Sequence, residues 1–210
     1  MHLRADHAED SIPALRQLIR DHPLGVLTTA IRSASQPFIQ SSHVPWVLDV
    51  QDESSETELG TLRGHLARAN PQRKTMVESL PPADDRAGTG GNVLDQEVLV
   101  LFTAPAHHYV TPKFYYAETK PATGKVVPTW NYAAVQAYGR ARIYHEPGSE
   151  ETSAFLARQI SDLFWHGETS VMGYTGEDGR PGPWEIAIDR LQGKFKMSQE
   201  SGEGDREGII

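Results

Sequence analysis

The sequence predicts a mainly β fold of the α+β class, an antiparallel barrel with helices on its outside. About six or seven segments have the alternation or β-branched content of strands, and only two or three have the period of helices. The helical segments do not alternate regularly with the strands, which argues against a parallel α/β sheet. With 210 residues and no repeat or linker, the chain fits one domain over residues 1–210.

The amino-acid composition limits the cellular compartment and the classes of binding partner that the protein can have. The chain has no Cys, so it carries no disulfide framework, thiolate metal site or thiol nucleophile. Its formal net charge of −8 disfavours direct binding to nucleic acid or to an anionic membrane surface. The N-terminus lacks the apolar core of a signal peptide, and no apolar stretch is long enough to span a bilayer. We therefore expect a cytoplasmic protein without a membrane partner.

The N-terminal half is expected to begin with a helix over residues 11–21, capped by Asp10 or Ser11. Three strands follow in the prediction, at residues 24–31, 37–49 and 61–67. Pro45 lies inside the second of them and predicts an edge, a bulge or a break. Residues 49–58 contain five acids and no base, which is typical of a solvated loop.

The rest of the chain is expected to contain two helices and three strands. Asn70 and Pro71 begin a short helix, as N-cap and first helical residue. The later elements are a buried strand at 97–104, an ordered functional loop at 105–128, a strand with one apolar face at 131–146, a helix at 150–165 and a last strand at 184–198.

No motif for a familiar nucleotide or metal site is present. The sequence has no P-loop, no dinucleotide-binding glycine motif, no zinc-protease motif and no nucleophile elbow. His107 and His108 are adjacent, so in a strand they point to opposite faces and do not chelate one metal together. The chemistry must therefore come from segments with unusual local composition.

The most informative segment is residues 62–74. Its bases are Arg63, Arg68, Arg73 and Lys74. No acid occurs in residues 61–76, although the whole chain is acidic. The helix start at Asn70 attracts anions, and Gly64 permits close approach of the backbone. The segment predicts a phosphate site, and a basic surface helix that covers the barrel is the alternative.

Aromatic residues interleave with polar ones in residues 109–120 and 127–135. Lysine, Thr129 and Asn131 accompany the rings there, a composition suited to a flat ligand ring with polar edges. Trp130 and Asn131 open a strand and are expected near a barrel mouth. A core tryptophan with a turn-capping asparagine is the alternative.

Two more segments have polar residues on a strand. In residues 40–45, Ser42 or its neighbour faces a ligand, because successive residues point to opposite sides; His43 is a ligand contact or a structural histidine. In residues 191–199, Lys196 shares a strand face with other polar residues, either as a binding surface or as protection of a solvated edge.

Five segments together resemble one family in their order and spacing. They read SSHVP, LRGHLARANPQ, TPKFYY, VPTWNYAAVQAYG and LQGKFKMSQ. The family is the PaiB type, also called FMN-binding negative transcriptional regulators. The resemblance implies a six-stranded antiparallel split β-barrel, similar to pyridoxamine phosphate oxidases, that forms a homodimer with FMN in clefts at its interface. The family often has an aromatic residue at the position of Arg73.

The resemblance also implies roles for single residues. Arg63 would lie along the FMN, with Arg63 or Lys120 near its phosphate. The other cofactor contacts that it implies are Ser42, His43, Gly64, His65, Leu66, Ala67, Asn70, Tyr115, Thr129, Trp130, Asn131, Lys196 and Gln199. Lys196 and Gln199 would reach across the dimer. It implies no metal ligand and does not single out a catalytic residue.

Three functions are open on the sequence. FMN carries redox chemistry without a proton-transfer side chain, which favours an FMN-dependent oxidoreductase such as an NAD(P)H-dependent flavin reductase. The family label suggests a transcriptional regulator that acts through protein or DNA contacts, although the sequence has no helix-turn-helix pair. Some barrels of this fold bind or degrade haem, which would require an axial histidine.

Overall fold

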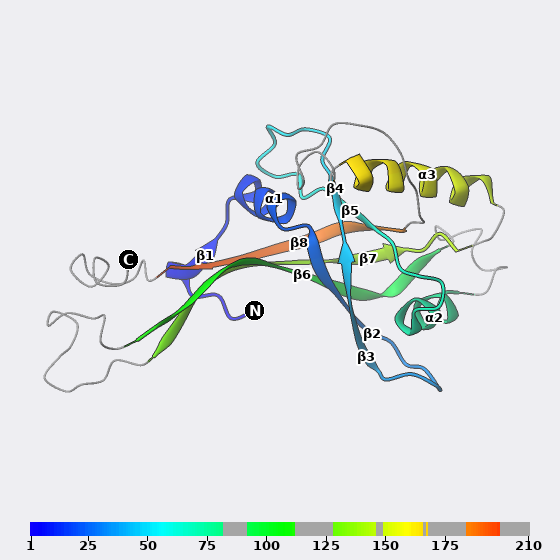
Figure 1. The fold of residues 1–210 in the computed structure, drawn as a ribbon, viewed down its shortest axis with the longest axis horizontal. Coiled ribbons are helices and arrows are strands. Elements are labelled where there is room, and N and C mark those ends of the chain that lie inside the picture. The colour runs from blue at the N-terminus through cyan, green and yellow to red at the C-terminus, as the bar shows by residue number, and fades with distance from the viewer. Residues whose placement is uncertain (82–91, 112–127, 146–148, 166, 168–183, 198–210) are drawn as a thin grey trace, which may run out of the picture.

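The structure is a computed structural model that describes residues 1–81, 92–111, 128–145, 149–165, 167 and 184–197. One eight-stranded antiparallel sheet forms its centre, in the order β3-β2-β6-β7-β8-β5-β4, with β1 paired to β8. The strands are β1 (Ala8–Glu9), β2 (Leu24–Ala30), β3 (Ile39–Pro45), β4 (Val47–Asp49), β5 (Thr61–Gly64), β6 (Val93–Val110), β7 (Thr129–Arg142) and β8 (Trp184–Lys196). The long strands β6–β8 run across the molecule and β2–β5 cross them, so the sheet curls into a half-barrel (Figure 1).

The mainly β prediction is confirmed, but the strand count of six is too low. The predicted strand over 37–49 is broken after Pro45, where the N–H of Trp46 turns to the carbonyl of Pro23 (2.9 Å). The break separates β3 from β4, which lie at opposite ends of the sheet order. The two-residue β1 is the other strand that the sequence did not predict.

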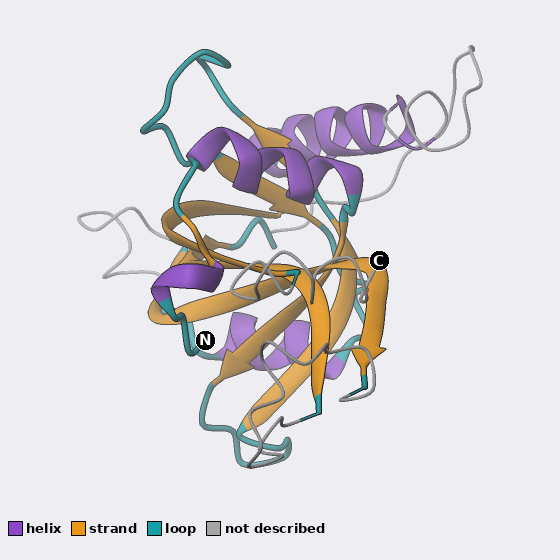
Figure 2. Ribbon diagram, turned by 90° about the vertical axis from the view of Figure 1, so that its left-hand side faces the viewer, coloured by secondary structure: helices purple, strands orange, loops and turns teal. Residues whose placement is uncertain are grey.

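Three α-helices pack on this sheet: α1 (Ile12–Asp21), α2 (Pro71–Glu78) and α3 (Glu150–Trp165). A short 3-10 helix, η1 (Ala5–His7), precedes them. Ser11 caps α1, as predicted, and Leu15 and Ile19 bury one face of it. Helices α1 and α2 add side chains to one common core from different ends of the barrel, as Figures 1 and 2 show. Among the described residues, no helix is long and apolar enough to cross a membrane.

The strand β7 confirms the alternation that the sequence shows. Its inward residues are buried, including Val135, Ala137 and Ala141, each at most 2% exposed. Its neighbour β6 is longer than predicted, because residues 105–110 continue the strand and residues 107–110 pair with residues 129–132. A register shift interrupts the pairing between Thr103 and His107. The prediction of a loop is therefore wrong for residues 105–110, and residues 112–127 of that prediction lie outside the described residues.

The acidic loop after β4 is fastened to α1. Arg16 is 1% exposed and donates to the backbone carbonyls of Glu53, Ser55 and Glu58 at 2.9–3.0 Å. A buried guanidinium needs several acceptors, and these carbonyls provide them. The loop is therefore an ordered part of the fold and not only a solvated connection.

Candidate functional site

The start of α2 is tied to β3 through Asn70. Its Oδ1 caps the helix by accepting from the N–H groups of Gln72 (2.8 Å) and Arg73 (3.4 Å). Its Nδ2 donates to Ser42 Oγ at 3.2 Å. Because the cap uses these N–H groups, an anion at this place would be bound by side chains more than by the helix N-terminus.

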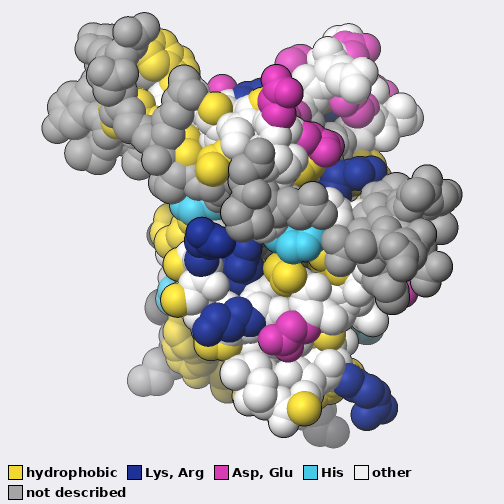
Figure 3. Space-filling view, turned by 90° about the vertical axis from the view of Figure 1, so that its right-hand side faces the viewer, with side chains coloured by type: hydrophobic (Ala, Val, Ile, Leu, Met, Phe, Trp, Pro, Cys, Tyr) yellow, Lys and Arg dark blue, Asp and Glu magenta, His cyan; other side chains and the backbone are white. Residues whose placement is uncertain are grey.

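Two arginines carry the charge of this site. Burial and the positive charge of Arg68 both lower the pKa of the Arg73 guanidinium. Neither forms an ion pair with a carboxylate of the described residues. Figure 3 shows Lys and Arg side chains gathered on this face of the molecule, with His side chains beside them. Two guanidinium groups without a carboxylate are an arrangement that a phosphate dianion stabilises.

His65 lies in the same connection, directly after β5. It is half-buried, and burial lowers the pKa of its imidazole, so the ring is neutral at neutral pH. Its Nδ1 is buried and has no hydrogen-bond partner among the described residues. A buried ring nitrogen without a partner is a place where a ligand can complete the hydrogen bonding.

Arg63 belongs to a different network. It is 2% exposed, and its Nη2 donates to Asp49 Oδ1 and Asp162 Oδ2, both at 2.7 Å. Its Nη1 donates to Gln159 Oε1 at 2.9 Å, and Gln159 Nε2 donates back to the Arg63 carbonyl at 3.3 Å. The carboxylates raise the pKa of Arg63 despite its burial. The guanidinium therefore joins β4, β5 and α3, in place of the phosphate contact predicted for it.

Gly64, Leu66 and Ala67, which follow Arg63, pack against the core or hydrogen-bond within the chain. A Cβ on Gly64 would lie 2.9 Å from Trp46 Cε3, so the missing side chain serves packing against Trp46. Leu66 packs against the core, and the carbonyl of Ala67 accepts from the N–H of Asn70 at 2.9 Å. Three predicted contacts lie outside the described residues: Tyr115, Lys120 and Gln199.

Ser42 and His43 point to opposite sides of β3. Ser42 faces α2 and bonds Asn70, whereas His43 is exposed and is paired in register with Val26 on the outward face of the sheet. The structure thus brings Ser42, and not His43, to the start of α2.

A second group of predicted residues lies where β6 and β8 end and β7 begins, which we call the distal end of these strands. Trp130 is 52% exposed, with the rings of His107 and Tyr109 at centroid distances of 5.6 and 5.9 Å. Lys196 Nζ donates to the Trp130 carbonyl at 3.1 Å and also to Thr129 Oγ1. The aromatic platform is therefore held in place while its tryptophan remains open to contact.

Asn131 differs from its neighbour in this group. It is 2% exposed, and its Nδ2 lies 3.5 Å from His108 Nε2 across the β6–β7 pair. It thus faces inward, and the alternation of β7 places Trp130 outward and Asn131 inward.

The two groups are far apart in one chain. Across the sheet, Ser42 pairs with Leu27 of β2, Leu27 with Val100 of β6, and Val100 with Ala137 of β7, so Ser42 lies at the same height as Ala137. From Ala137 to Trp130 the strand advances by about 23 Å. Figure 1 shows α2 at one end of the molecule and the distal end of the β6–β7 pair at the other. One chain does not bring both groups to one ligand.

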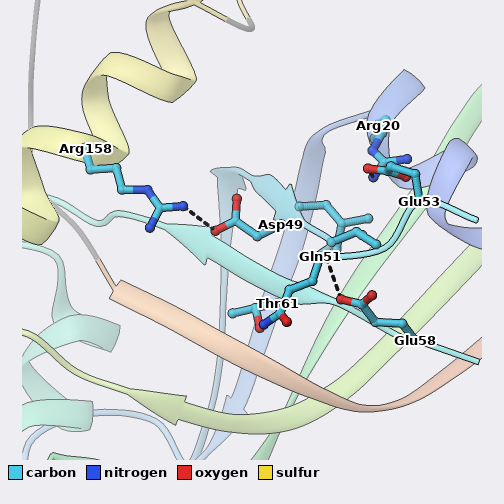
Figure 4. Close-up of a pocket in the computed structure, with 9 residues that line it drawn as sticks. Arg20, Asp49, Gln51, Glu53, Glu58, Thr61 and Arg158 are labelled. Carbon is cyan, nitrogen blue, oxygen red and sulfur yellow. Dashed lines mark hydrogen bonds and ion pairs between the residues drawn. The ribbon is translucent and has the colours of Figure 1, made fainter. Parts of the chain in front are cut away.

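A separate polar cavity of about 460 Å³ lies between α1, α3 and the loop after β4 (Figure 4). Arg20 pairs with Glu53 at 2.6 Å, and Arg158 lies 3.4 Å from Asp49. Glu58 accepts from two backbone N–H groups of its own loop, which lower its pKa. These charges are satisfied by protein groups, and the cavity shares no lining residue with the start of α2.

Comparison with known proteins identifies the family. Residues 1–195 match the family described as "Putative FMN-binding domain". The chain belongs to this family. An uncharacterized protein of Aspergillus fumigatus is 55% identical, over all of this chain and 89% of its own length. The protease synthase and sporulation protein PAI 2 of Bacillus subtilis is 26% identical over 71% of this chain and 62% of its own. The PaiB resemblance is confirmed.

Two solved structures have a similar fold. The flavocytochrome Anf3 from Azotobacter vinelandii has a TM-score of 0.53 at 12% identity, with 98% of this chain and 78% of that chain covered. The FAD and Heme binding protein from Mycobacterium smegmatis has a TM-score of 0.52 at 13% identity, with 90% and 73% covered. The predicted split barrel is confirmed. The family also confirms FMN as the predicted cofactor, and the Arg68–Arg73 pair fits its phosphate.

Proposed function

We propose that this chain is a homodimeric FMN-binding oxidoreductase that holds the FMN phosphate between Arg68 and Arg73. The observation that carries the proposal is the pair itself: neither guanidinium group forms an ion pair with a carboxylate of the described residues, and the positive charge of Arg68 lowers the pKa of Arg73. Each charge-assisted phosphate contact contributes on the order of 1.5–3 kcal/mol to binding. The site was predicted in this segment of the sequence, but with Arg63 as the ligand.

The neighbouring polar groups would orient the rest of the cofactor. Asn70 and Ser42 hold each other beside the arginines and present a polar edge for the ribityl chain. His65 offers a neutral ring nitrogen that has no hydrogen-bond partner within the described ranges. FMN, when bound, supplies the electron transfer. The protein supplies position and positive charge, so an NAD(P)H-dependent reductase would need no acid–base pair of its own.

A second copy of the chain would complete the site. The aromatic platform consists of Trp130 with the rings of His107 and Tyr109. Together with Thr129 and Lys196, it lies too far from the start of α2 to share one flavin with Arg73 of the same chain. In a two-fold dimer, the platform of one protomer would therefore cover the cofactor held by its partner.

The phosphate assignment is tested by comparing FMN with riboflavin, which lacks the phosphate. The double variant R68M/R73M should lose FMN affinity by about 100-fold or more, since two charge-assisted contacts are removed, and should keep its riboflavin affinity within about twofold. Arg20→Met removes one surface arginine in another part of the molecule and is the matched control. Equal loss for both ligands, or no loss for FMN, would place the phosphate elsewhere.

The dimer is tested by complementation between two defective proteins. One carries R68M/R73M and the other carries Trp130→Ser, and each alone should bind FMN poorly. In an equal mixture that exchanges subunits, about half of the dimers are mixed, and each of these has one intact site. FMN binding should therefore return to about a quarter of all sites. A monomer in sedimentation, or a mixture that binds no better than its components, would contradict the shared site.

The oxidoreductase activity is tested on the purified protein loaded with FMN. We expect NADH or NADPH to bleach the flavin absorption band in the absence of oxygen, and an added electron acceptor to restore it. A flavin that neither nucleotide bleaches would refute the NAD(P)H-dependent activity while leaving the FMN site intact.

A further inference from the structure

Gln72 connects α2 to two strands at once. It is the second residue of the helix and is 2% exposed. Its Nε2 donates to Thr29 Oγ1 (3.0 Å) and the Leu27 carbonyl (3.3 Å) of β2, and to the Gln40 carbonyl (3.1 Å) of β3. A single amide group thus fixes the helix relative to the β2–β3 hairpin.

This arrangement leaves part of the same amide unsatisfied. Gln72 Oε1 is buried and has no hydrogen-bond donor among the described residues. An apolar side chain of similar length would fill the space without burying that oxygen, and buried polar groups without partners are costly. A polar group at this place therefore specifies where the helix lies more than it increases packing.

The position that Gln72 fixes is that of the arginine site. Arg73 is the next residue, and Asn70, two residues before, bonds Ser42 of β3. One turn later, Gln40 Nε2 donates to Thr75 Oγ1 at 3.1 Å. These bonds hold the first turns of α2 against β3, so the backbone position from which the Arg73 side chain extends is fixed relative to Ser42.

We infer that Gln72 is a positioning residue for the phosphate site: it does not touch the cofactor, but it places Arg73 where it binds phosphate. The inference rests on the proposed FMN function. It explains why a site made of two repelling cations keeps its geometry before a ligand arrives, because the helix that carries Arg73 is anchored by neutral hydrogen bonds on its buried side.

The test compares two buried glutamines. Gln72→Met keeps the length of the side chain and removes its hydrogen bonds. Gln159→Met does the same on α3, where Gln159 is 0% exposed and bonds Arg63 far from α2. FMN and riboflavin affinities are measured for both variants and for the unaltered protein, together with their thermal unfolding.

We expect Gln72→Met to weaken FMN binding by about tenfold while riboflavin binding changes by less than about twofold, since Arg73 depends on the position of the helix whereas Asn70 is also held by its own bond to Ser42. Gln159→Met should lower stability without changing the ratio of the two affinities. If Gln72→Met lowers stability but leaves that ratio unchanged, Gln72 is merely structural and the inference is overturned. If the unaltered protein binds no FMN, the proposed function fails instead.

A milder variant covers the case in which Gln72→Met does not fold. Thr29→Val removes one acceptor of the Gln72 amide at nearly constant shape, and Thr29 is itself 1% exposed. It should shift the FMN-to-riboflavin ratio in the same direction by about threefold. An unchanged ratio in a folded Thr29→Val protein would also overturn the inference.

Discussion

Removal of the Arg63 guanidinium should destabilise the fold without weakening FMN binding. Arg63→Met deletes the donors to Asp49, Asp162 and Gln159 and keeps much of the side-chain volume. Breaking a buried ion pair from one side costs about 3–5 kcal/mol. The side chains of Asp49 and Asp162 are 34% and 39% exposed, so water rehydrates both carboxylates after the change. We therefore expect the lower end of that range, a loss of about 3 kcal/mol in the free energy of unfolding.

Urea unfolding of the cofactor-free protein, at one fixed protein concentration, measures this loss. Arg158→Met is the control, because Arg158 contacts the same two carboxylates at 3.4 and 3.5 Å but is 66% exposed. It should cost less than about 1 kcal/mol. The FMN affinity of folded Arg63→Met should stay within about twofold. An equally small loss of stability in Arg63→Met, or an FMN affinity about tenfold weaker, would refute the assignment of Arg63 to the structural network.

Three more changes test other parts of the structure. Burial lowers the pKa of His65 in the folded state, so the unfolded chain takes up the proton first and the free energy of unfolding should fall as pH drops below about 6.5. His65→Asn should flatten that part of the profile of urea midpoint against pH. An unchanged profile would contradict the role of His65. In Gly139→Ala, the new Cβ would lie 2.0 Å from the Ala187 carbonyl oxygen, so the unfolding temperature should fall by an amount equivalent to about 3 kcal/mol; a protein as stable as the original would show that β7 and β8 separate easily there. Arg16→Met should make the loop after β4 sensitive to limited proteolysis while FMN binding is retained, and a loop that stays resistant would mean that Glu58 alone holds it.

The sheet could be predicted where one side of a strand is buried. In β7, small and apolar residues occupy every second position from Ala133 to Ala141, and a period of two specifies both the strand and its inner face. The same local reasoning located Ser11 and Asn70 as helix caps, because a cap depends on its nearest neighbours in the sequence.

Elements that depend on distant pairing were not predictable in this way. Residues 105–110 lack periodicity, and Pro105 argues against a strand, yet pairing with 129–132 extends β6 over them. The segment around Arg63 predicts a phosphate site because it contains no acid, and the family resemblance implies Arg63 or Lys120 near the phosphate. Its partners Gln159 and Asp162 are 96 and 99 residues away, and no local pattern reports such a pairing. The absence of acids applied equally to Arg68 and Arg73, which form no ion pair with a carboxylate in the part of the chain that the structure describes.

The network around Arg63 also bears on how the chain folds as it is synthesised. β5 can form its hairpin with β4 early, and Asp49 then provides one partner for Arg63 within 14 residues. The other edge of β5 pairs with β8, and the remaining donors of Arg63 bond acceptors on α3. Both elements follow much later in the chain. Closing such a long loop is slow, and until then the nascent protein exposes an unpaired strand edge. Chains interrupted before α3 should therefore aggregate, and those that extend past β8 should not.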